Sequence, residues 1–199
     1  MNPNKPPAIQ RLSRTVLAAA LLLLASPAWS ATQERPDAEM RQTLLEAINS
    51  SDSFQDRFDA EVWLTDMSNR MGKRIKNSEE RLHILKLVHY EARRAKLEPE
   101  LVLALINVES NFDRFAISSA GARGLMQIMP FWLDEIGRPG DNLFDIATNL
   151  RFGCTILNLY LKREKGNVHK ALARYNGSVG KHWYPQRVFK ALRTTWYQQ

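Results

Sequence analysis

One glutamate, Glu109, lies at the end of an apolar helical stripe in the middle of the chain. Leu101, Leu105, Glu109 and Phe112 are spaced so that they share one face of a helix. Burial beside leucine and phenylalanine disfavours the charged form of a carboxyl group and raises its pKa. A carboxyl group that is still protonated near neutral pH can act as a general acid. The spacing therefore indicates a proton donor, and the alternative is a glutamate at a helix end that turns outward to solvent.

A run of small residues follows Glu109 and leaves little side-chain bulk over it. The run contains Ser118, Ser119, Gly121, Ala122 and Gly124. Glycine allows a ligand to approach the main chain closely. Ser118 and Gln127 can each donate and accept hydrogen bonds, which suits sugar hydroxyls or an N-acetyl group. The composition is also typical of plain turns, so both interpretations stay open on these residues alone.

Helical patterns account for most of the chain around this segment. Apolar spacing and terminus signals predict helices over 38–48, 54–71, 77–96, 131–136, 144–165, 168–175 and 185–196, and one more from Pro99 to the segment of Glu109. Asn77 is expected to cap the third of these helices, and Pro99 suits a first helical turn. The predicted class is all-α, or α+β at most, with a short β-excursion near 116–128.

The first thirty residues have the layout of a secretory signal peptide. Lys5, Arg11 and Arg14 precede an unbroken apolar run from Val16 to Ala25, and small residues follow near Ser30. The run is shorter than the roughly 20 residues that span a bilayer. We expect residues 1–30 to be cleaved and the mature protein to be exported, and an uncleaved inner-membrane anchor is the alternative.

Charge and cysteine usage narrow the classes of partner. Removal of residues 1–30 lowers the formal net charge from +7 to +4, with no block of like charges. This predicts no nucleic-acid partner and suits an anionic polymer such as cell wall.

The single cysteine, Cys154, cannot form an internal disulfide and is interpreted as a small buried hydrophobe rather than a catalytic thiol. The four histidines, His83, His89, His169 and His182, lack metal-ligand spacing, so no metal and no cofactor are expected.

Three blocks of residues carry a more specific pattern. The first contains Glu109-Ser110, Phe112, Ser118, Gly121-Ala122, Gly124-Leu125-Met126-Gln127 and Pro130, and the later two are Asn149 to Gly153 (NLRFG) and Arg174 to Gly177 (RYNG). In order and spacing they resemble soluble lytic transglycosylase family 1, the SLT-type enzymes of the lysozyme-like superfamily, over roughly Leu97 to Trp196. The sequence departs from the family where Ala-Arg-Tyr-Asn-Gly-Ser replaces the common Ala-Ala-Tyr-Asn-Ala-Gly, which is expected to alter the charge of the cleft through Arg174.

The resemblance implies a lysozyme-like fold and cleavage of peptidoglycan between N-acetylmuramic acid and N-acetylglucosamine, with a 1,6-anhydro product. It implies that Glu109 is the catalytic acid and base. The implied substrate-binding residues are Ser118, Gln127, Met126, Met129, Tyr175 and Asn176. Asn149 is expected to be structural and to tie its helix to the cleft. Trp132, Trp183 and Tyr184 are candidates for stacking on sugars, although such aromatic residues are more often part of the core.

Two alternatives to a lytic transglycosylase remain. A hydrolytic muramidase of the same fold would need a second carboxylate, for which Asp113, Asp134 and Asp145 are the candidates. A wall-binding or secretion-apparatus module would keep the fold without catalysis. Residues 31–96 are expected to form an N-terminal helical extension packed on a catalytic domain of residues 97–199, or a docking surface for a secretion-system or divisome partner. A monomer in the periplasm of a Gram-negative cell is expected.

Overall fold

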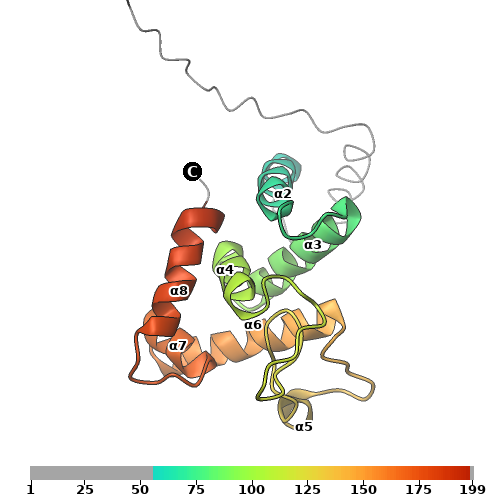
Figure 1. The fold of residues 1–199 in the computed structure, drawn as a ribbon. Helices are drawn as coiled ribbons and strands as arrows, with labels where there is room; N and C mark the ends of the chain where they lie inside the picture. The colour runs from blue at the N-terminus through green and yellow to red at the C-terminus, as the bar shows by residue number, and fades with distance from the viewer. Residues whose placement is uncertain (1–55, 198–199) are drawn as a thin grey trace, which may run out of the picture. The chain divides into compact units, whose positions relative to one another are not determined.

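Seven α-helices and one π-helical turn form the regular structure of residues 56–197, the part of the chain that the computed structural model describes (Figure 1). They are α2 (Arg57–Met71), α3 (Ser78–Arg94), α4 (Pro99–Glu109), α5 (Trp132–Ile136), α6 (Ile146–Arg163), α7 (Val168–Tyr175), α8 (Trp183–Ala191) and η1 (Leu192–Trp196). The expected signal peptide and the expected helix at 38–48 lie outside the described residues.

Side-chain caps set the beginnings of several helices. Asp56, Asn77, Asp145 and Asn167 accept hydrogen bonds from backbone N–H groups in the first turns of α2, α3, α6 and α7. Such caps satisfy donors that have no partner within the helix. Pro99 occupies the first turn of α4, where a missing N–H is harmless. The predicted starts at Asn77 and Pro99 are therefore confirmed.

The C-terminal helix differs from its predicted course. It begins at Trp183, earlier than expected, and its last turn widens into the π-helical segment η1. This segment places the Trp196 ring in the core, where it is fully buried and its centroid lies 5.3 Å from that of Phe112. The periodicity of apolar residues does not distinguish a π turn from an α turn, so the sequence did not reveal it.

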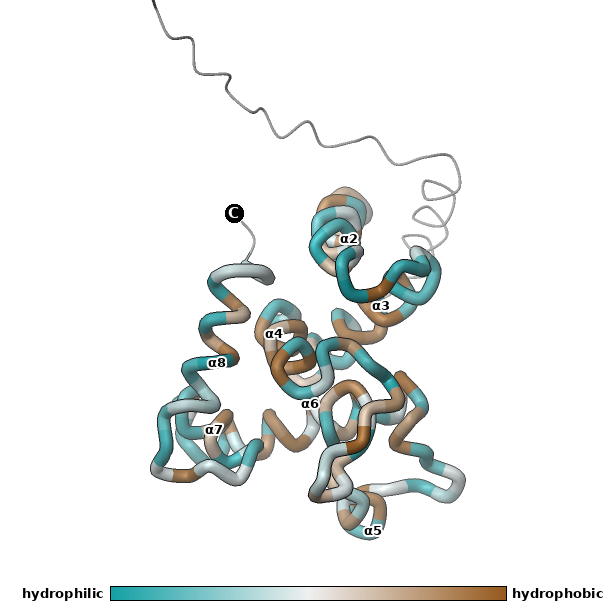
Figure 2. The backbone as a smooth tube through the Cα atoms, viewed as in Figure 1, coloured by the Kyte–Doolittle hydropathy of each residue, from teal (hydrophilic) through white to brown (hydrophobic). Residues whose placement is uncertain are grey.

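Helix α4 lies at the centre of the core. All residues from Leu101 to Ile106 are buried, which is typical of a helix surrounded by other elements. Figure 2 shows hydrophobic segments, coloured brown, on α4. It packs against α3, α8 and η1. Burial of one leucine or isoleucine side chain stabilises a fold by about 1.5–3 kcal/mol. The helix that carries Glu109 is thus held by hydrophobic contacts along most of its length.

Helices α2 and α3 share this core. Leu64 and Met67 of α2 and Leu85 and Val88 of α3 are fully buried in the same apolar cluster as Leu103 of α4. Helix α3 packs against α2, α4 and α6. Within the described residues, the segment before residue 97 therefore contributes to the core that supports Glu109.

Isolated β-bridges are the β-structure that residues 56–197 contain. Ile117 pairs with Arg123, and Arg123 pairs with Ile128, both in antiparallel fashion. They lie within the range 116–128, so the predicted all-α class with a short β-excursion is confirmed. Among residues 56–197, no helix is long and apolar enough to cross a membrane.

Candidate active site

Glu109 is the last residue of α4 and is partly buried against α8. The hydroxyl of Tyr184, at the start of α8, donates a short hydrogen bond to its Oε1 atom. Tyr184 is only 1% exposed, so this contact is shielded from water. Arg187, one turn further along α8, lies close enough for its charge to act on Glu109. The carboxyl group therefore faces a phenol and a more distant cation.

Burial raises the pKa of Glu109 from 4.5 to about 7, although the hydrogen bond from Tyr184 and the charge of Arg187 both lower it. Burial also raises the pKa of Tyr184 well above its ordinary value, and the nearby charge of Glu109 adds to this effect. The phenol therefore stays protonated and remains the donor. A carboxyl group with a pKa near 7 can give up a proton and take one back at neutral pH, as general acid–base catalysis requires.

Ser110 fixes the point at which α4 ends. Its Oγ atom donates to the Leu125 carbonyl at 2.8 Å and accepts from the Phe112 N–H at 3.2 Å. Phe112 itself is buried, with a backbone φ of 69°. The serine after Glu109 thus joins the end of the helix to the loop that contains Gly124 and Gln127.

Asn149 holds the same loop from the opposite side. Its Oδ1 accepts from the Met126 N–H at 2.8 Å, and its Nδ2 donates to the carbonyls of Arg123 at 2.9 Å and Leu143 at 2.7 Å. The Asn149 side chain is 1% exposed, so water cannot take its place as the hydrogen-bond partner of these three backbone groups. The prediction that Asn149 ties its helix to the site is confirmed.

Two glycines make this close packing feasible. A Cβ atom at Gly124 would lie 2.4 Å from Asn149 Nδ2, and the backbone there has a φ of +76°. A Cβ atom at Gly153, one turn along α6 from Asn149, would lie 2.2 Å from Met126 Sδ. Glycine is therefore required at both positions by contacts and not only by chain flexibility.

Met126 does not line an open cleft, contrary to the sequence-based expectation. Its side chain is fully buried and packs over Gly153, as the glycine contacts show. Its backbone carbonyl instead accepts a hydrogen bond of 2.8 Å from the Tyr175 hydroxyl. The side chain occupies the space that the missing Cβ atom of Gly153 leaves, and this contact between distant segments cannot be predicted from the order of residue types.

Ser118 and Gln127 already make contacts within the loop. Ser118 Oγ accepts from the Ala122 N–H at 3.1 Å. Gln127 Nε2 donates to the carbonyls of Ala116 at 3.1 Å and Gly124 at 3.0 Å. The serine proton and the Gln127 Oε1 atom are the polar groups that these bonds leave for a ligand.

Of the remaining predicted site residues, Tyr175 lies close enough to Glu109 for the charge of Glu109 to act on its hydroxyl group. Burial raises the pKa of Tyr175 well above its ordinary value, and the charge of Glu109 contributes. Asn176 is exposed and caps the end of α7 with its backbone, while Met129 is partly buried just before α5. The structure therefore assembles Glu109 with Tyr175 and Tyr184, and leaves Asn176 at the surface.

The candidate second carboxylates are occupied or exposed. Asp113 Oδ1 accepts from the Phe115 N–H at 2.9 Å, and Asp145 Oδ1 accepts from the Thr148 N–H at 2.8 Å to cap α6. Asp134 is exposed on α5. Among the described residues, the groups that shift the pKa of Glu109 are Tyr184 and Arg187, and neither is a carboxylate.

Tyr184 is the site residue that sequence reasoning did not identify as such. The sequence makes it a candidate for stacking or for the core, and the structure places it in the core with its hydroxyl at Glu109. A buried tyrosine needs a partner for its hydroxyl, and a buried carboxylate needs a donor. That pairing rule was the available signal, but it did not say which tyrosine would be involved. Trp183 beside it is 48% exposed.

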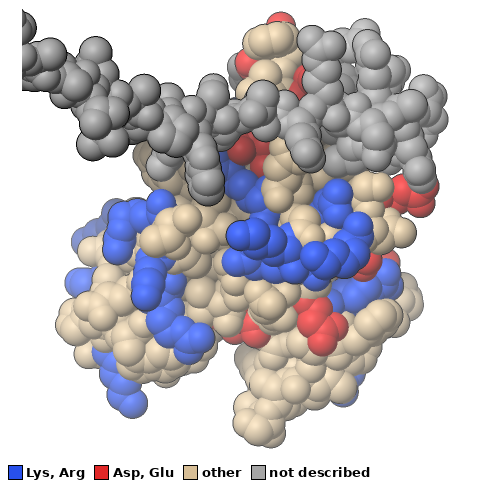
Figure 3. Space-filling model, turned by 45° about the horizontal axis from the view of Figure 1, so that its top comes forward, with Lys and Arg blue, Asp and Glu red and all other residues tan. Residues whose placement is uncertain are grey.

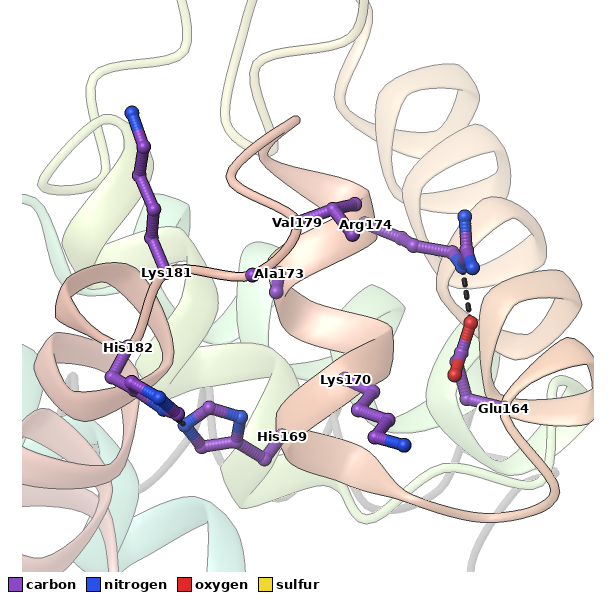
Figure 4. A pocket seen from close by; sticks show the side chains of 9 residues that line it. Glu164, His169, Lys170, Ala173, Arg174, Val179, Lys181 and His182 are labelled. Atoms are coloured by element: carbon purple, nitrogen blue, oxygen red, sulfur yellow. Dashed lines mark hydrogen bonds and ion pairs between the residues drawn. The ribbon is translucent and has the colours of Figure 1, made fainter.

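A separate pocket of about 350 Å³ lies beside α7 and does not include Glu109 (Figure 4). Its charged and imidazole side chains are those of Glu164, His169, Lys170, Arg174, Lys181 and His182. Arg174 forms an ion pair with Glu164 there, so a carboxylate offsets its charge. The expected effect of Arg174 on the charge of the cleft stays a prediction. Within residues 56–197, no group of three or more potential metal ligands comes together.

Basic side chains are prominent on one face of the protein. Figure 3 shows Lys and Arg spread over this face, with fewer acidic side chains among them. The whole chain has a formal net charge of +7. Such an excess attracts anionic polymers at long range without specifying one.

Comparison with known proteins places this site in a family. The chain matches the family model described as Transglycosylase SLT domain over residues 86–195. It is 30% identical over 112 residues to membrane-bound lytic murein transglycosylase C of Yersinia enterocolitica, covering 48% of this chain and 31% of that protein. It is 34% identical over 103 residues to a transglycosylase of Enterobacteria phage PRD1, covering 48% of this chain and 38% of that protein.

Among solved structures, an inactive mutant of the lytic transglycosylase Slt from Pseudomonas aeruginosa is 19% identical, with a TM-score of 0.45, and the match covers 78% of this chain and 32% of that one. The chain spans about a third of the length of the curated relatives it matches. Glu109, Asn149, Tyr175 and Tyr184 all fall inside residues 86–195, which make up more than half of the chain. The chain therefore belongs to the transglycosylase SLT domain family.

Proposed function

We propose that the protein is a peptidoglycan lytic transglycosylase. It cleaves the β-1,4 bond between N-acetylmuramic acid and N-acetylglucosamine without water and leaves a 1,6-anhydro end. Membership of the SLT family and the similarity to two relatives, a lytic murein transglycosylase and a transglycosylase, support this proposal. The observation that carries it is a lone, partly buried carboxyl group, Glu109, whose pKa is about 7.

The first step is proton donation. Protonated Glu109 gives its proton to the glycosidic oxygen while the bond from that oxygen to the anomeric carbon breaks. The N-acetylglucosamine unit leaves with a free hydroxyl, and positive charge develops at the anomeric carbon. The ionised Glu109 that results is stabilised by the Tyr184 hydroxyl and by the charge of Arg187.

The second step returns the proton. The 6-hydroxyl of the muramic acid attacks its own anomeric carbon, and Glu109 takes the proton from that hydroxyl. The carboxyl group is regenerated, and no water is consumed. Hydrolases of glycosides normally need a second carboxylate to serve as nucleophile or to activate water. The substrate supplies the nucleophile here, which fits the capping and turn roles of Asp145 and Asp113.

Substrate contacts follow from the groups that the loop leaves available. The Ser118 hydroxyl and Gln127 Oε1 would bind the N-acetyl group or neighbouring hydroxyls. Tyr175 would lie over the reacting sugar, with Met129 and Asn176 at the edges of the cleft. Met126 contributes through its carbonyl, which holds the Tyr175 hydroxyl at 2.8 Å.

We propose that the protein acts on the cell wall after export, in the periplasm. The basic face of the molecule suits an anionic wall polymer (Figure 3). A secretion-system or divisome partner at residues 31–96 stays a prediction, as does a monomeric state.

The deciding experiment measures the masses of muropeptides that the purified full chain releases from isolated sacculi. Wild-type protein is expected to release products that are one water lighter than hydrolysis would give, and Glu109→Gln is expected to release none. Reducing ends of full mass would identify a muramidase instead. Sacculus binding without products from either protein would indicate a wall-binding module.

A further inference from the structure

One arginine, Arg74, forms hydrogen bonds to residues on both sides of the end of α4. Arg74 lies in the connection between α2 and α3. Its Nη2 donates to Asn107 Oδ1 at 3.0 Å, and its Nε donates to Asn111 Oδ1 at 3.1 Å. Asn107 comes two residues before Glu109, and Asn111 comes two residues after it. The guanidinium therefore bridges the two sides of the helix terminus that presents the carboxyl group.

One partner in the bridge, Asn111, has a left-handed backbone conformation. Asn111 has a φ of 51°, in the left-handed region that few residues other than glycine, asparagine and aspartate adopt. Its Oδ1 also accepts from Asn107 Nδ2 at 3.2 Å. A planar guanidinium offers two donors at a fixed separation, which a lysine ammonium does not. The geometry suits arginine at position 74 in particular.

The C-terminal segment completes the same cluster. Trp196 Nε1 donates to Asn107 Oδ1 at 3.1 Å, and the Arg74 guanidinium lies 5.3 Å from the centre of the Trp196 ring. Trp196 is fully buried, so the arginine stacks on a rigid surface. Three segments distant in sequence, namely the connection after α2, the end of α4 and η1, therefore meet at Arg74.

We infer that Arg74 is a positioning residue for Glu109: it holds the end of α4 so that the carboxyl group stays against Tyr184. The inference rests on the proposed function for its effect on turnover. Arg74 precedes residue 86, where the match to the family model begins. The segment before the family domain thereby contributes to the active site as well as to the core.

The effect of Arg74 acts through geometry rather than through its charge. The cation whose charge lowers the pKa of Glu109 is Arg187. If the end of α4 loosens, Glu109 gains water and loses its contact with Tyr184. Loss of the Tyr184 hydrogen bond by itself would raise the pKa of Glu109, but burial has the larger effect on this carboxyl group. Greater hydration favours the ionised form, so the pKa would fall from about 7 towards its ordinary value of 4.5.

The test compares Arg74→Gln with a matched control, Arg81→Gln. Arg81 is also partly buried and donates to Ser68 Oγ at 3.1 Å and to the carbonyls of Ile75 and Lys76 at 2.9 Å, but none of these partners is on α4. Both variants lose hydrogen bonds of the same kind near α2, so a general loss of stability should appear in both.

Two measurements on the full chain distinguish Arg74→Gln from Arg81→Gln. Carbon-13 NMR titration gives the pKa of Glu109, and kinetics on isolated sacculi give kcat and KM. In Arg74→Gln we expect a lower Glu109 pKa, a kcat reduced about 10- to 100-fold and a KM within about twofold of wild type, because a small misplacement of the reacting group affects the transition state most. Arg81→Gln should retain the wild-type pKa and kcat.

A second variant guards against misfolding of the first. Asn111→Gly removes the acceptor of Arg74 Nε while allowing the positive φ, so the backbone can keep its course. It should shift the pKa and kcat in the same direction by a smaller amount. Equal Glu109 pKa and kcat in Arg74→Gln and Arg81→Gln would overturn the positioning role. Loss of the proposed function would appear separately, as a wild-type protein without anhydro products, and the NMR titration would still decide the role of Arg74.

Discussion

Two glutamates are partly or wholly buried at helix interfaces, and they have opposite kinds of partner. Glu91 on α3 forms an ion pair with Arg94 at 2.6 Å, and Arg94 Nη2 also donates a hydrogen bond to Thr155 Oγ1 on α6 at 2.9 Å. Glu109 at the end of α4 accepts instead from the neutral hydroxyl of Tyr184 on α8. The first carboxylate has a direct countercharge, and the second has a donor without one.

The difference separates a structural carboxylate from a reactive one. A countercharge offsets the cost of removing a carboxylate from water, so the pair of Glu91 and Arg94 can link α3 to α6. A neutral donor offsets that cost only in part, so the pKa of Glu109 rises to about 7 and the site is less stable at high pH. Active sites often contain this kind of unfavourable arrangement, because it supplies a group that exchanges protons at neutral pH.

The largest expected effect comes from exchanging each carboxylate for its amide. Glu109→Gln should lower kcat on isolated sacculi by about 10²- to 10⁴-fold, because it removes the proposed general acid and base. Glu91→Gln should leave kcat within about twofold and cost about 1 kcal/mol of stability, because Arg94 is 40% exposed and water can solvate it. Turnover measurements and urea unfolding of both variants check this. The comparison fails if Glu91→Gln loses as much activity as Glu109→Gln.

The second effect concerns stability and pH. The carboxyl group of Glu109 titrates near 4.5 when unfolded and at about 7 when folded, so the folded state holds the proton more tightly. This contribution to stability is complete below 4.5 and is lost as pH rises through 7. Glu109→Gln should therefore become more stable than wild type by up to about 3 kcal/mol at pH 8. Urea unfolding at pH 5 and pH 8 measures the change, and an unchanged difference between the two pH values would contradict it.

A smaller effect is expected from Tyr184→Phe. The ring still fills the core, but the donor to Glu109 is lost, so the pKa of Glu109 should rise above about 7. The alkaline limb of the pH profile of kcat should move to higher pH, and kcat should fall roughly tenfold, as loss of a hydrogen bond to a charged group implies. Tyr175→Phe is the matched control, because its hydroxyl donates to the Met126 carbonyl and not to Glu109. An alkaline limb that stays in place or moves to lower pH would show that Tyr184 does not stabilise the carboxylate.

The smallest effect is expected at Arg187. Its side chain is exposed, and its charge acts on Glu109 through solvent-screened attraction. Arg187→Gln should raise the pKa of Glu109 slightly and change kcat less than about threefold. High salt should reproduce part of this shift in wild-type protein and none of it in the variant. A salt effect of equal size in both proteins would assign the attraction to other cations.

Several local features followed from residue types and spacing. Asn77 and Pro99 mark helix starts because a side-chain acceptor and a missing N–H act within one turn. The raised pKa of Glu109 followed from its place on the stripe of Leu101 and Leu105.

Other features depend on contacts between distant segments. Tyr184 lies 75 residues from Glu109, and Trp196 lies 89 residues from Asn107. Neither contact can therefore be predicted from the spacing of residues within one helix. The cleft-lining role for Met126 was wrong because its side chain is fully buried over Gly153 on α6. The π-helical end of the last helix was equally hidden, because its apolar pattern also fits an α-helix.

The sequence by itself determined most of the helices, the helix starts at Asn77 and Pro99, the catalytic candidate Glu109 and the structural role of Asn149, because these depend on neighbours within a few residues or on a family pattern read in order. Only the tertiary structure decided which hydroxyl meets Glu109, which cation acts on it and which arginine holds the end of its helix. Those contacts arise when α2, α4, α8 and η1 pack into one core, and packing selects partners by shape and distance rather than by order along the chain.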